Sequence, residues 1–344
     1  MRYVRKKYLF TILLSLTMSF FITSCSNSEN NSPKVRIACF SNLTHAQAMI
    51  GMSGGQFQKA LGENYEIEWK TFNAGPSEIE ALIAGEVDIG YIGPVPAING
   101  FVKSNGELQI IAGASDAGGI LVSRKDLIIK DVKELENKKI AVPQFGNTQD
   151  LILRNILKEN GLKDSIKGGN VQVIQLENAD IKTLIDRGEI DAALVPEPWG
   201  SRLIKEAGAN VVLDYNQVYR QGAYTSAVVV ARTDFIEKHP DIIKEFLEAH
   251  VQLTDYINKN SDTCKTDINS QITKLTKSSI PDDILGNAFK RLIITNNPEK
   301  DSIVDFIKVS KEEGLIDKEP DIEKLLNLEI LNNVLKENGQ AEIQ

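Results

Sequence analysis

Histidine and cysteine are scarce in this sequence, with three of each among 344 residues. His45, His239 and His250 have no second ligand residue at metal-binding spacing. Cys39 and Cys264 are too far apart in the sequence to indicate a disulfide framework, and we expect both to be buried and free. The sequence therefore predicts no metal and no cofactor.

Motifs of common enzymes are also missing, including a phosphate-binding loop and a dinucleotide-binding fingerprint. Gly51-Met-Ser-Gly-Gly55 has the letters of a serine-hydrolase elbow. That elbow follows a strand, whereas Ala46 to Met52 is typical of a helix that ends at the glycines. We find no catalytic constellation and predict that the protein is not an enzyme.

Acidic residues outnumber basic ones, 47 against 39, and the net charge is −8. Basic residues near the amino terminus (Arg2, Arg5, Lys6 and Lys7) leave the rest of the chain more acidic still. An acidic surface argues against nucleic acid as a partner.

Those basic residues precede an apolar run, Leu9 to Ile22, that is shorter than the ~20 residues needed to span a bilayer. The pattern is typical of a signal peptide. It ends in Ile22-Thr-Ser-Cys25, which resembles the bacterial lipobox, in which the cysteine becomes lipidated. The alternative is an ordinary signal peptide with a chance cysteine. We predict a signal peptide at 1–24, lipidation of Cys25, a polar tether at 25–33, and hence an extracytoplasmic protein anchored to the cell membrane.

Short apolar strands alternate with helices in the rest of the chain, which predicts an α/β fold. Expected strands lie at 34–40, 65–72, 87–92, 109–114, 139–142, 171–176 and 223–231, and expected helices include 77–84, 179–186, 240–257 and 322–335.

The order of elements recurs in the second half of the chain. Gly85-Glu-Val-Asp88 precedes a strand that ends in Pro94-Val-Pro96, and Gly188-Glu-Ile-Asp191 precedes a strand that ends in Pro196-Glu-Pro198. In each copy we expect a helix to end at the glycine and the strand to end in a proline-rich turn. Two copies in the same order predict two similar lobes.

The second lobe is predicted to be inserted into the first. Gly118 to Ser123 leads out of the first lobe, and Ala223 to Ala231 returns to it. We expect lobe one at 34–120 and 223–344, padded by C-terminal helices, and lobe two at 121–222. Two crossings form a hinge that allows the lobes to open and close.

Two loops, at equivalent places in the two lobes, each lead into the N-terminus of a helix. The N-terminus of a helix carries unpaired N–H groups and partial positive charge, so it binds anions without Lys or Arg. Helix capping is the alternative for either loop alone, but matching loops in facing lobes favour a site for a small anion. The predicted ligand-binding residues in these loops are Asn42, Thr44, His45, Asn147, Thr148 and Gln149.

Residues after other strands are expected to reach the same cleft. Gly93 and Pro94 let a ligand approach the backbone, and Ser115 follows the strand 109–114. Trp199 lies either beside the opposite face or in the core of its lobe. Glu197 is a poor partner for an anion, so it would accept a hydrogen bond from a ligand amine or orient donors.

These segments resemble the aliphatic-sulfonate-binding proteins of ABC importers, in the group that also includes nitrate- and taurine-binding proteins. The resemblance implies a periplasmic-binding-protein type II fold, with two α/β lobes joined by a two-crossing hinge. It implies ligand contacts at Thr44, His45, Gly93, Ser115, Thr148 and Gln149. Val95 is a departure, because relatives often have Ser after Gly-Pro. The resembling segments are Phe72-Asn-Ala-Gly-Pro-Ser77, Asp88-Ile-Gly-Tyr-Ile-Gly-Pro94, Ala141-Val-Pro-Gln-Phe-Gly-Asn-Thr-Gln-Asp150 and Val195-Pro-Glu-Pro-Trp199.

The resemblance also implies a function. It predicts a monomeric substrate-binding component that captures a small organic anion, such as an aliphatic sulfonate, and delivers it to an ABC permease and its ATPase. Nitrate, taurine and a pyrimidine-type vitamin precursor are alternative ligands for the same fold. A further alternative is an enzyme similar to a pyrimidine synthase that uses cysteines with iron, for which two distant cysteines supply no cluster.

Overall fold

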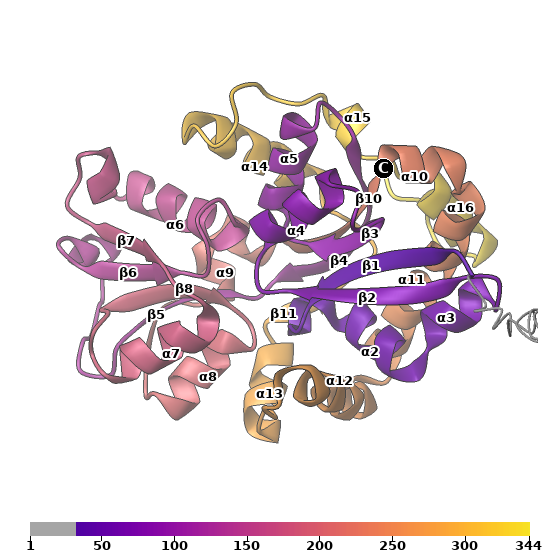
Figure 1. Cartoon of the computed structure of the whole chain (residues 1–344). Helices are drawn as coiled ribbons and strands as arrows, with labels where there is room; N and C mark the ends of the chain where they lie inside the picture. Colours follow the sequence, from indigo (N-terminus) through magenta and orange to yellow (C-terminus); the bar gives the residue numbers. More distant parts are fainter. Residues whose placement is uncertain (1–31) are drawn as a thin grey trace, which may run out of the picture. The chain divides into compact units, whose positions relative to one another are not determined.

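The computed structural model describes residues 32–344, and their strands form two sheets (Figure 1). The predicted signal peptide, Cys25 and most of the tether lie outside the described residues. The six-stranded sheet has the order β11-β4-β10-β3-β1-β2. Its strands are β1 (Lys34–Phe40), β2 (Glu66–Phe72), β3 (Ile89–Ile92), β4 (Leu108–Ala117), β10 (Thr225–Arg232) and β11 (Leu292–Ile294).

The five-stranded sheet has the order β7-β6-β8-β5-β9. Its strands are β5 (Gly119–Ser123), β6 (Lys139–Val142), β7 (Gln172–Gln175), β8 (Ala192–Pro196) and β9 (Asn210–Leu213).

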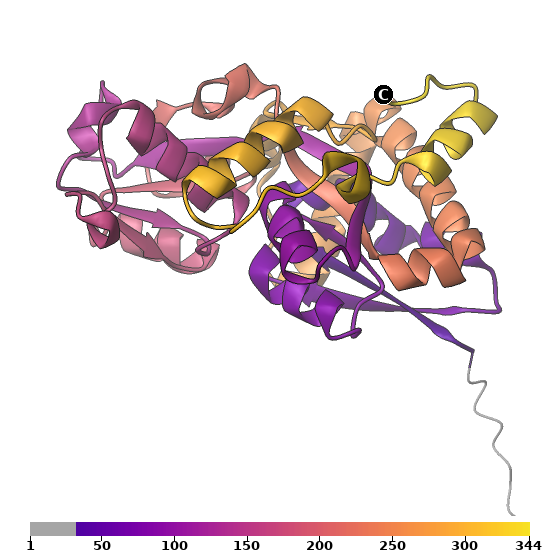
Figure 2. The same cartoon turned by 90° about the horizontal axis from the view of Figure 1, so that it is seen from above.

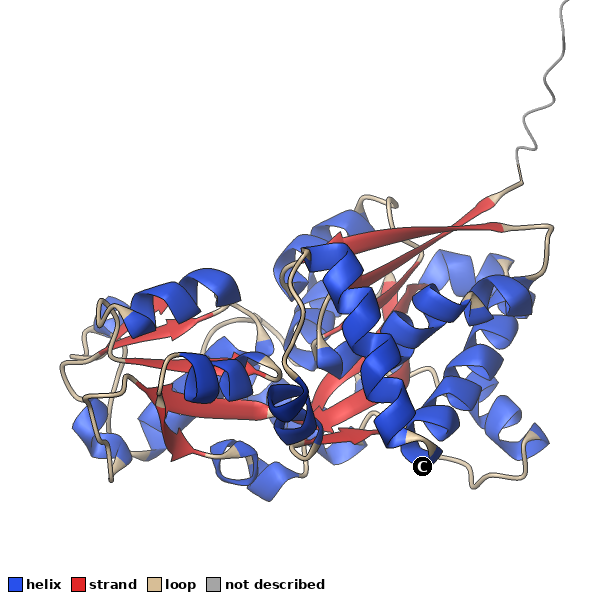
Figure 3. Cartoon of the chain, turned by 90° about the horizontal axis from the view of Figure 1, so that it is seen from below, coloured by secondary structure: helices blue, strands red, loops and turns tan. Residues whose placement is uncertain are grey.

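Helices cover both faces of each sheet (Figure 3), so the inner strands are buried on both sides. In β1, for example, Ile37 and Cys39 belong to one core and Ala38 to the core on the other face. The α-helices are α2 (Ala46–Gly54), α3 (Gln56–Leu61), α4 (Gly75–Ile83), α5 (Pro94–Lys103), α6 (Thr148–Glu159), α7 (Asn178–Asp186), α8 (Trp199–Glu206), α9 (Tyr215–Val218), α10 (Thr233–Lys238), α11 (Pro240–Lys259), α12 (Ser261–Thr276), α13 (Asp282–Phe289), α14 (Lys300–Glu312), α15 (Ile322–Leu325) and α16 (Glu329–Glu337). The 3-10 helices are η1 (Leu43–His45), η2 (Val132–Leu135), η3 (Ser165–Lys167) and η4 (Arg220–Gly222).

The same parallel three-stranded unit forms one end of both sheets. β1 pairs in parallel with β2 and β3, and β6 pairs in parallel with β7 and β8. An antiparallel strand then follows in each sheet, β10 beside β3 and β5 beside β8. The α/β fold and the recurrence of its elements, both predicted from the sequence, are confirmed.

The repeated Gly-Glu-x-Asp motif performs the same structural task in both units. Gly85 and Gly188 end their helices in the left-handed region, with φ of 72° and 73°. The Asp88 carboxylate accepts a hydrogen bond from the backbone N–H of Arg36 at 2.9 Å, and Asp191 does the same for Lys139 at 2.9 Å. Each aspartate thereby fixes the first strand of its unit to the third.

The chain passes between the sheets twice within the described residues. Ala117 and Gly118, both with positive φ, carry it from β4 to β5, and η4 precedes its return through β10. β5 already begins at Gly119, just before the predicted boundary at 120. α14 packs against both α5 and α6, which flank different sheets (Figure 2). The division into two lobes that open and close stays a prediction.

Two details of the predicted elements are wrong. The turn expected at 94–96 is the first turn of α5, because proline suits the first position of a helix. The helix expected at 322–335 is interrupted between α15 and α16. Leu326 adopts an extended conformation there, and the N–H of Asn327 bonds to the carbonyl oxygen of Ile110 at 2.9 Å.

Cys39 and Cys264 are buried and form no disulfide, as expected. Among residues 32–344, no helix is long and apolar enough to cross a membrane.

Candidate ligand-binding site

Several helices that flank the two sheets begin around one small cavity. η1, α4 and α5 reach it from the six-stranded sheet, and α6 and α7 from the five-stranded sheet. The cavity has a volume of about 40 Å³, which is room for about three water molecules or the head of a small anion. We call it the niche. Its lining residues are Phe40, Asn42, Thr44, His45, Asn73, Ala74, Gly75, Gly93, Pro96, Pro143, Asn147, Thr148, Gln149, Asn178, Pro196 and Ser226.

Both helix-opening loops singled out in the sequence contribute to this lining, although they are far apart in the chain. The predicted residues that line the niche are Asn42, Thr44, His45, Gly93, Asn147, Thr148 and Gln149. The predicted residues that do not line it are Pro94, Ser115, Glu197 and Trp199.

The niche is lined by neutral groups. None of its lining residues is Lys, Arg, Asp or Glu. α4 begins after Ala74 and α5 after Gly93, and neither residue caps its helix with a side chain. Pro76, Pro94 and Pro96 have no N–H group. The first turns of α4 and α5 therefore offer the N–H groups of Gly75, Ser77 and Val95, and the helix dipoles point their positive ends at the cavity. This arrangement suits an anion.

Thr148 supplies an unsatisfied hydroxyl. Its side chain is 2% exposed, and its Oγ1 has no hydrogen-bond partner. A buried hydroxyl without a partner is unfavourable by ~1–3 kcal/mol. A ligand in the niche is the natural partner, because Thr148 is also the first residue of α6.

His45 is held as a neutral donor. Its Nδ1 accepts a hydrogen bond from the backbone N–H of Phe40 at 3.0 Å, and the Phe40 ring stacks on it at 4.5 Å. Burial lowers the pKa of His45 to about 3. A neutral imidazole whose Nδ1 accepts must carry its proton on Nε2. His45 thus has a single N–H to offer.

The two asparagines act as helix caps. The Oδ1 of Asn42 accepts hydrogen bonds from the backbone N–H of Thr44 at 3.0 Å and from its hydroxyl at 3.1 Å. The Oδ1 of Asn147 accepts from the backbone N–H of Asp150 at 2.9 Å. The capping alternative is therefore confirmed for both asparagines, and Thr148 and Gln149 remain the freer donors of the second loop.

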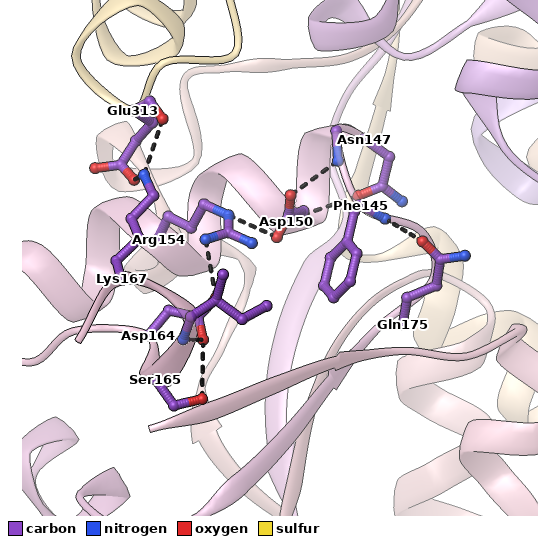
Figure 4. Close-up of polar contacts among 11 residues, drawn as sticks. Phe145, Asn147, Asp150, Arg154, Asp164, Ser165, Lys167, Gln175 and Glu313 are labelled. Atoms are coloured by element: carbon purple, nitrogen blue, oxygen red, sulfur yellow. Dashed lines mark hydrogen bonds and ion pairs between the residues drawn. The ribbon is translucent and has the colours of Figure 1, made fainter. Parts of the chain in front are cut away.

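A polar network fixes the start of α6 (Figure 4). Asp150 accepts hydrogen bonds from the backbone N–H of Gly146 at 2.8 Å and from Arg154 at 2.9 Å. Arg154 also binds Asp164 at 3.0 Å, and the Gln175 side chain accepts from the N–H of Phe145 at 2.9 Å. These contacts hold the loop 144–147 and present Thr148 to the niche.

Ser115 supports the niche through its neighbours. Its hydroxyl donates to the carbonyl oxygen of Thr44 at 2.9 Å and lies 3.1 Å from the Ser226 hydroxyl. Ser226 itself lines the niche, and the sequence reading missed it. It is the extra residue of a β-bulge between Thr225 and Ala227, and bulges redirect side chains in this way.

Glu197 is occupied by protein groups. Its carboxylate accepts hydrogen bonds from the backbone N–H of Ser201 at 3.0 Å and the Ser201 hydroxyl at 2.9 Å, and it pairs with Arg291 at 3.2 Å. Burial raises the pKa of Glu197, and Arg291 and Ser201 oppose that shift. Arg291 precedes β11 and also pairs with Asp214 at 2.6 Å, so this cluster joins residues that flank the two sheets.

Pro94, another predicted ligand-binding residue, is buried in the first turn of α5.

A larger cavity of about 960 Å³ adjoins the niche. We call it the outer cleft. It shares Phe40, Asn42, Asn73, Ala74, Pro143 and Asn178 with the niche, so the two are direct neighbours. Trp199 lines the outer cleft, is half-buried and also packs against the core of the five-stranded sheet, so it combines both of the locations considered for it.

The repeat contained a signal for two of the missed residues. Asn73 lies between β2 and α4, and Asn178 begins α7 after β7. These are equivalent places in the two units, and both residues line the niche and the outer cleft. The carboxyl ends of strands in each unit point to the ligand site.

Solved structures share this fold. The alkanesulfonate-binding protein SsuA from Xanthomonas axonopodis pv. citri, bound to MOPS, is 14% identical, with a TM-score of 0.72 over 86% of this chain and 98% of that chain. The periplasmic nitrate-binding protein NrtA from Synechocystis PCC 6803 is 16% identical, with a TM-score of 0.74 over 89% of both chains. The fold is therefore that of the periplasmic binding proteins.

The sequence gives the family. The chain belongs to the NMT1-like family, whose model matches residues 28–269. The taurine-binding periplasmic protein of Escherichia coli (strain K12) is 30% identical over 280 residues, which cover 78% of this chain and 84% of that protein. A putative aliphatic sulfonates-binding protein of Bacillus subtilis (strain 168) is 25% identical over 345 residues, covering 96% and 98%.

Proposed function

We propose that this protein is the extracytoplasmic substrate-binding component of an ABC importer and that it binds the head of an aliphatic sulfonate in the niche. The single observation that carries the proposal is the buried Thr148 hydroxyl, which has no partner and lies in a cavity without charged side chains. A ligand oxygen would satisfy that hydroxyl.

The donors favour a sulfonate over a carboxylate. A sulfonate is tetrahedral, stays ionised at neutral pH and has no proton to donate. The niche offers the Nε2–H of His45, the Thr148 hydroxyl and N–H groups at helix starts, so it meets three acceptor oxygens with donors from several directions. Nitrate matches the small volume of the niche, but it would leave the outer cleft without a ligand group.

Calorimetric titration tests the proposal. Ethanesulfonate should bind more tightly than propanoate, nitrate or a pyrimidine. Thr148→Val removes the hydroxyl and keeps the branched shape, so it should weaken ethanesulfonate binding about ten- to a hundredfold, since a hydrogen bond to a charged group contributes ~1.5–3 kcal/mol. The free protein should become no less stable, because the buried hydroxyl has no partner to lose.

The exposed Thr183 of α7 gives a matched control. Thr183→Val should leave affinity unchanged. Tightest binding of a pyrimidine, or unchanged affinity in Thr148→Val, would refute the assignment of the niche.

We further propose that the protein works as a monomer with a hinged cleft. Asn73 donates a hydrogen bond to Glu177 at 3.0 Å across the cleft, and Arg291 pairs with Glu197 and Asp214. Contacts of this kind would form on closure and break on opening. Small-angle scattering should show a more compact particle with saturating ethanesulfonate, and identical profiles with and without it would contradict a hinged cleft.

Delivery to a membrane importer completes the proposal. The protein would be tethered by a lipid on Cys25, after removal of residues 1–24, and would pass its ligand to an ABC permease and its ATPase. The basis for the anchor is the sequence Ile22-Thr-Ser-Cys25 alone.

A further inference from the structure

The niche has room for an anionic head only, whereas the adjoining outer cleft is far larger. Their volumes are about 40 Å³ and about 960 Å³. Phe40, Asn73 and Asn178 line both, so the substituent of a head bound in the niche would extend into the outer cleft. A ligand of two carbon atoms would leave most of that space to water.

Apolar side chains from distant parts of the chain line the outer cleft. Trp199 at the start of α8 is one of them. Leu275 of α12, together with Ile272 and Ile280, comes from the part of the chain beyond β10. α8 also contacts α13 (Figure 1), and Lys205 of α8 pairs with Asp283 of α13 at 2.7 Å.

The Trp199 ring is held as a platform. The Arg202 guanidinium lies over it, 4.9 Å from the ring. Trp199 is nevertheless half-buried and lines the cleft. An indole held in this way stacks well with a planar or extended apolar group.

The cations of the outer cleft are already paired. Lys182 and Arg202 both form ion pairs with Glu206, at 3.0 and 3.3 Å. The acidic residues of this cleft, Glu177 and Asp180, are exposed. The lining of the cleft is mixed: many of its residues are polar, Trp199, Leu275 and Ile280 offer apolar contact to a ligand tail, and neither cation is unpaired.

The apolar residues that α12 and the segment after it contribute to the cleft lie outside the part of the chain that defines the family. The family model ends at residue 269, whereas Ile272, Leu275 and Ile280 come after it. Membership of the family therefore does not assign these residues a ligand.

We infer that the outer cleft binds a bulky apolar tail against Trp199 and Leu275, so that the ligands of this protein are aryl or long-chain alkyl sulfonates. The inference rests on the proposed function, because the sulfonate head must occupy the niche. Trp199 and Leu275 then determine specificity for the tail, while Thr148 binds the head.

Titration of the full mature chain with ethanesulfonate, taurine, octanesulfonate and naphthalene-2-sulfonate tests the inference. The two bulky sulfonates should bind at least about tenfold more tightly than ethanesulfonate, since they bury more apolar surface. Trp199→Ala and Leu275→Ser should each remove most of that advantage and leave ethanesulfonate affinity within about twofold.

Fluorescence gives a readout that does not depend on the stability of these variants. The chain has two tryptophans, and Trp69 packs against Phe57 in the core of the other sheet. In Trp69→Phe, the emission of Trp199 should change more on binding naphthalene-2-sulfonate or octanesulfonate, which contact the ring, than on binding ethanesulfonate, which only closes the cleft.

The outcomes separate the two proposals. Three results would overturn the tail site and leave the head site intact. They are equal affinity for short and bulky sulfonates, tighter binding of taurine than of the bulky ligands, and equal losses of affinity for all ligands in Trp199→Ala. If no sulfonate binds to the wild-type protein, the proposed function is wrong and the tail site is wrong with it.

Discussion

The Thr148 hydroxyl oxygen lies 2.6 Å from the position that a β-carbon on Gly93 would occupy. Thr148 begins α6 and Gly93 precedes α5, so two helix starts from different sheets approach each other here to a distance that only glycine permits. The φ of Gly93 is −67°, which any residue adopts. Glycine is therefore needed at this position for space and not for backbone conformation.

Gly93→Ala should weaken ethanesulfonate binding roughly tenfold or more, because the added methyl displaces the Thr148 hydroxyl and with it a hydrogen bond to the ligand. Calorimetric titration measures the loss. Gly286→Ala is the control: Gly286 lies within α13 with nothing near its β-position, so that change should add ~0.5–1 kcal/mol of stability and leave affinity unaltered. Wild-type affinity in Gly93→Ala would contradict the close approach.

The repeated aspartates provide a matched pair of substitutions. Asp88 is 1% exposed and pairs with Arg36 at 2.6 Å and Arg232 at 3.3 Å. Asp191 is 25% exposed and pairs with Arg124 at 3.3 Å. Asp88→Asn should lower the free energy of unfolding by about 3 kcal/mol, since it breaks a buried ion pair. Asp191→Asn should cost about 1 kcal/mol. Urea unfolding measures both, and equal losses would show that burial does not set the difference.

Stability should fall as the pH rises from about 6.5 to 8. Burial, and then the charge of Glu299, raise the pKa of Asp116 to about 8, and burial also raises that of Glu78. A carboxyl group with a raised pKa in the folded state contributes stability at low pH that is lost as the pH rises through that pKa. Asp116→Asn should flatten the dependence of the melting temperature on pH in this window, and an unchanged slope would exclude Asp116 as its source.

Below this window the histidines act in the opposite direction. Burial lowers the pKa of His45 to about 3 and that of His250 to about 4. Their contribution to stability is present above the unfolded-state pKa of ~6.5 and is lost as the pH falls towards the folded-state values. Between about pH 4 and 6.5 the carboxyl and histidine contributions oppose each other, so the net fall in melting temperature with rising pH should appear above about pH 6.5. The exposed Asp180→Asn variant serves as a control and should reproduce the wild-type profile.

Cys25→Ala should abolish attachment to the membrane. Cells that express the wild-type protein should carry it in the membrane fraction with incorporated labelled fatty acid, and the variant should do neither. A chain that starts at Asn27 should fold and bind ethanesulfonate normally, because the described fold begins at β1. Membrane retention of Cys25→Ala at the wild-type level would rule out this anchor.

The strand–helix order was predictable because local signals mark it. Gly85 and Gly188 end helices, and Asp88 and Asp191 precede buried strands. Short local segments therefore indicate both the alternation of helices with strands and its repetition along the chain. The helix starts that form the niche follow from the same pattern, since parallel strands end at one edge of a sheet.

Features that depend on distant packing were not predictable. Ser226 reaches the niche because a bulge in β10 redirects it, and a strand pattern alone does not place a bulge. Glu197 follows a strand as expected, but Arg291, nearly a hundred residues later, occupies its carboxylate. Leu275 lines the same cleft as Trp199 because of where α12 packs, and no local motif specifies that packing.

The absence of charged side chains from the niche lining affects how fast an anion is captured. At long range the ligand meets the field of a chain whose net charge is −8, which repels it, and attraction begins only at contact with the dipoles of neutral groups. Salt screens this repulsion. It does not weaken an attraction at the same time, because no Lys or Arg lines the niche. Association rates measured by stopped flow should therefore increase with ionic strength. A positively charged pocket that steers its anion shows the reverse. This protein would thus collect its ligand faster in saline surroundings than in fresh water.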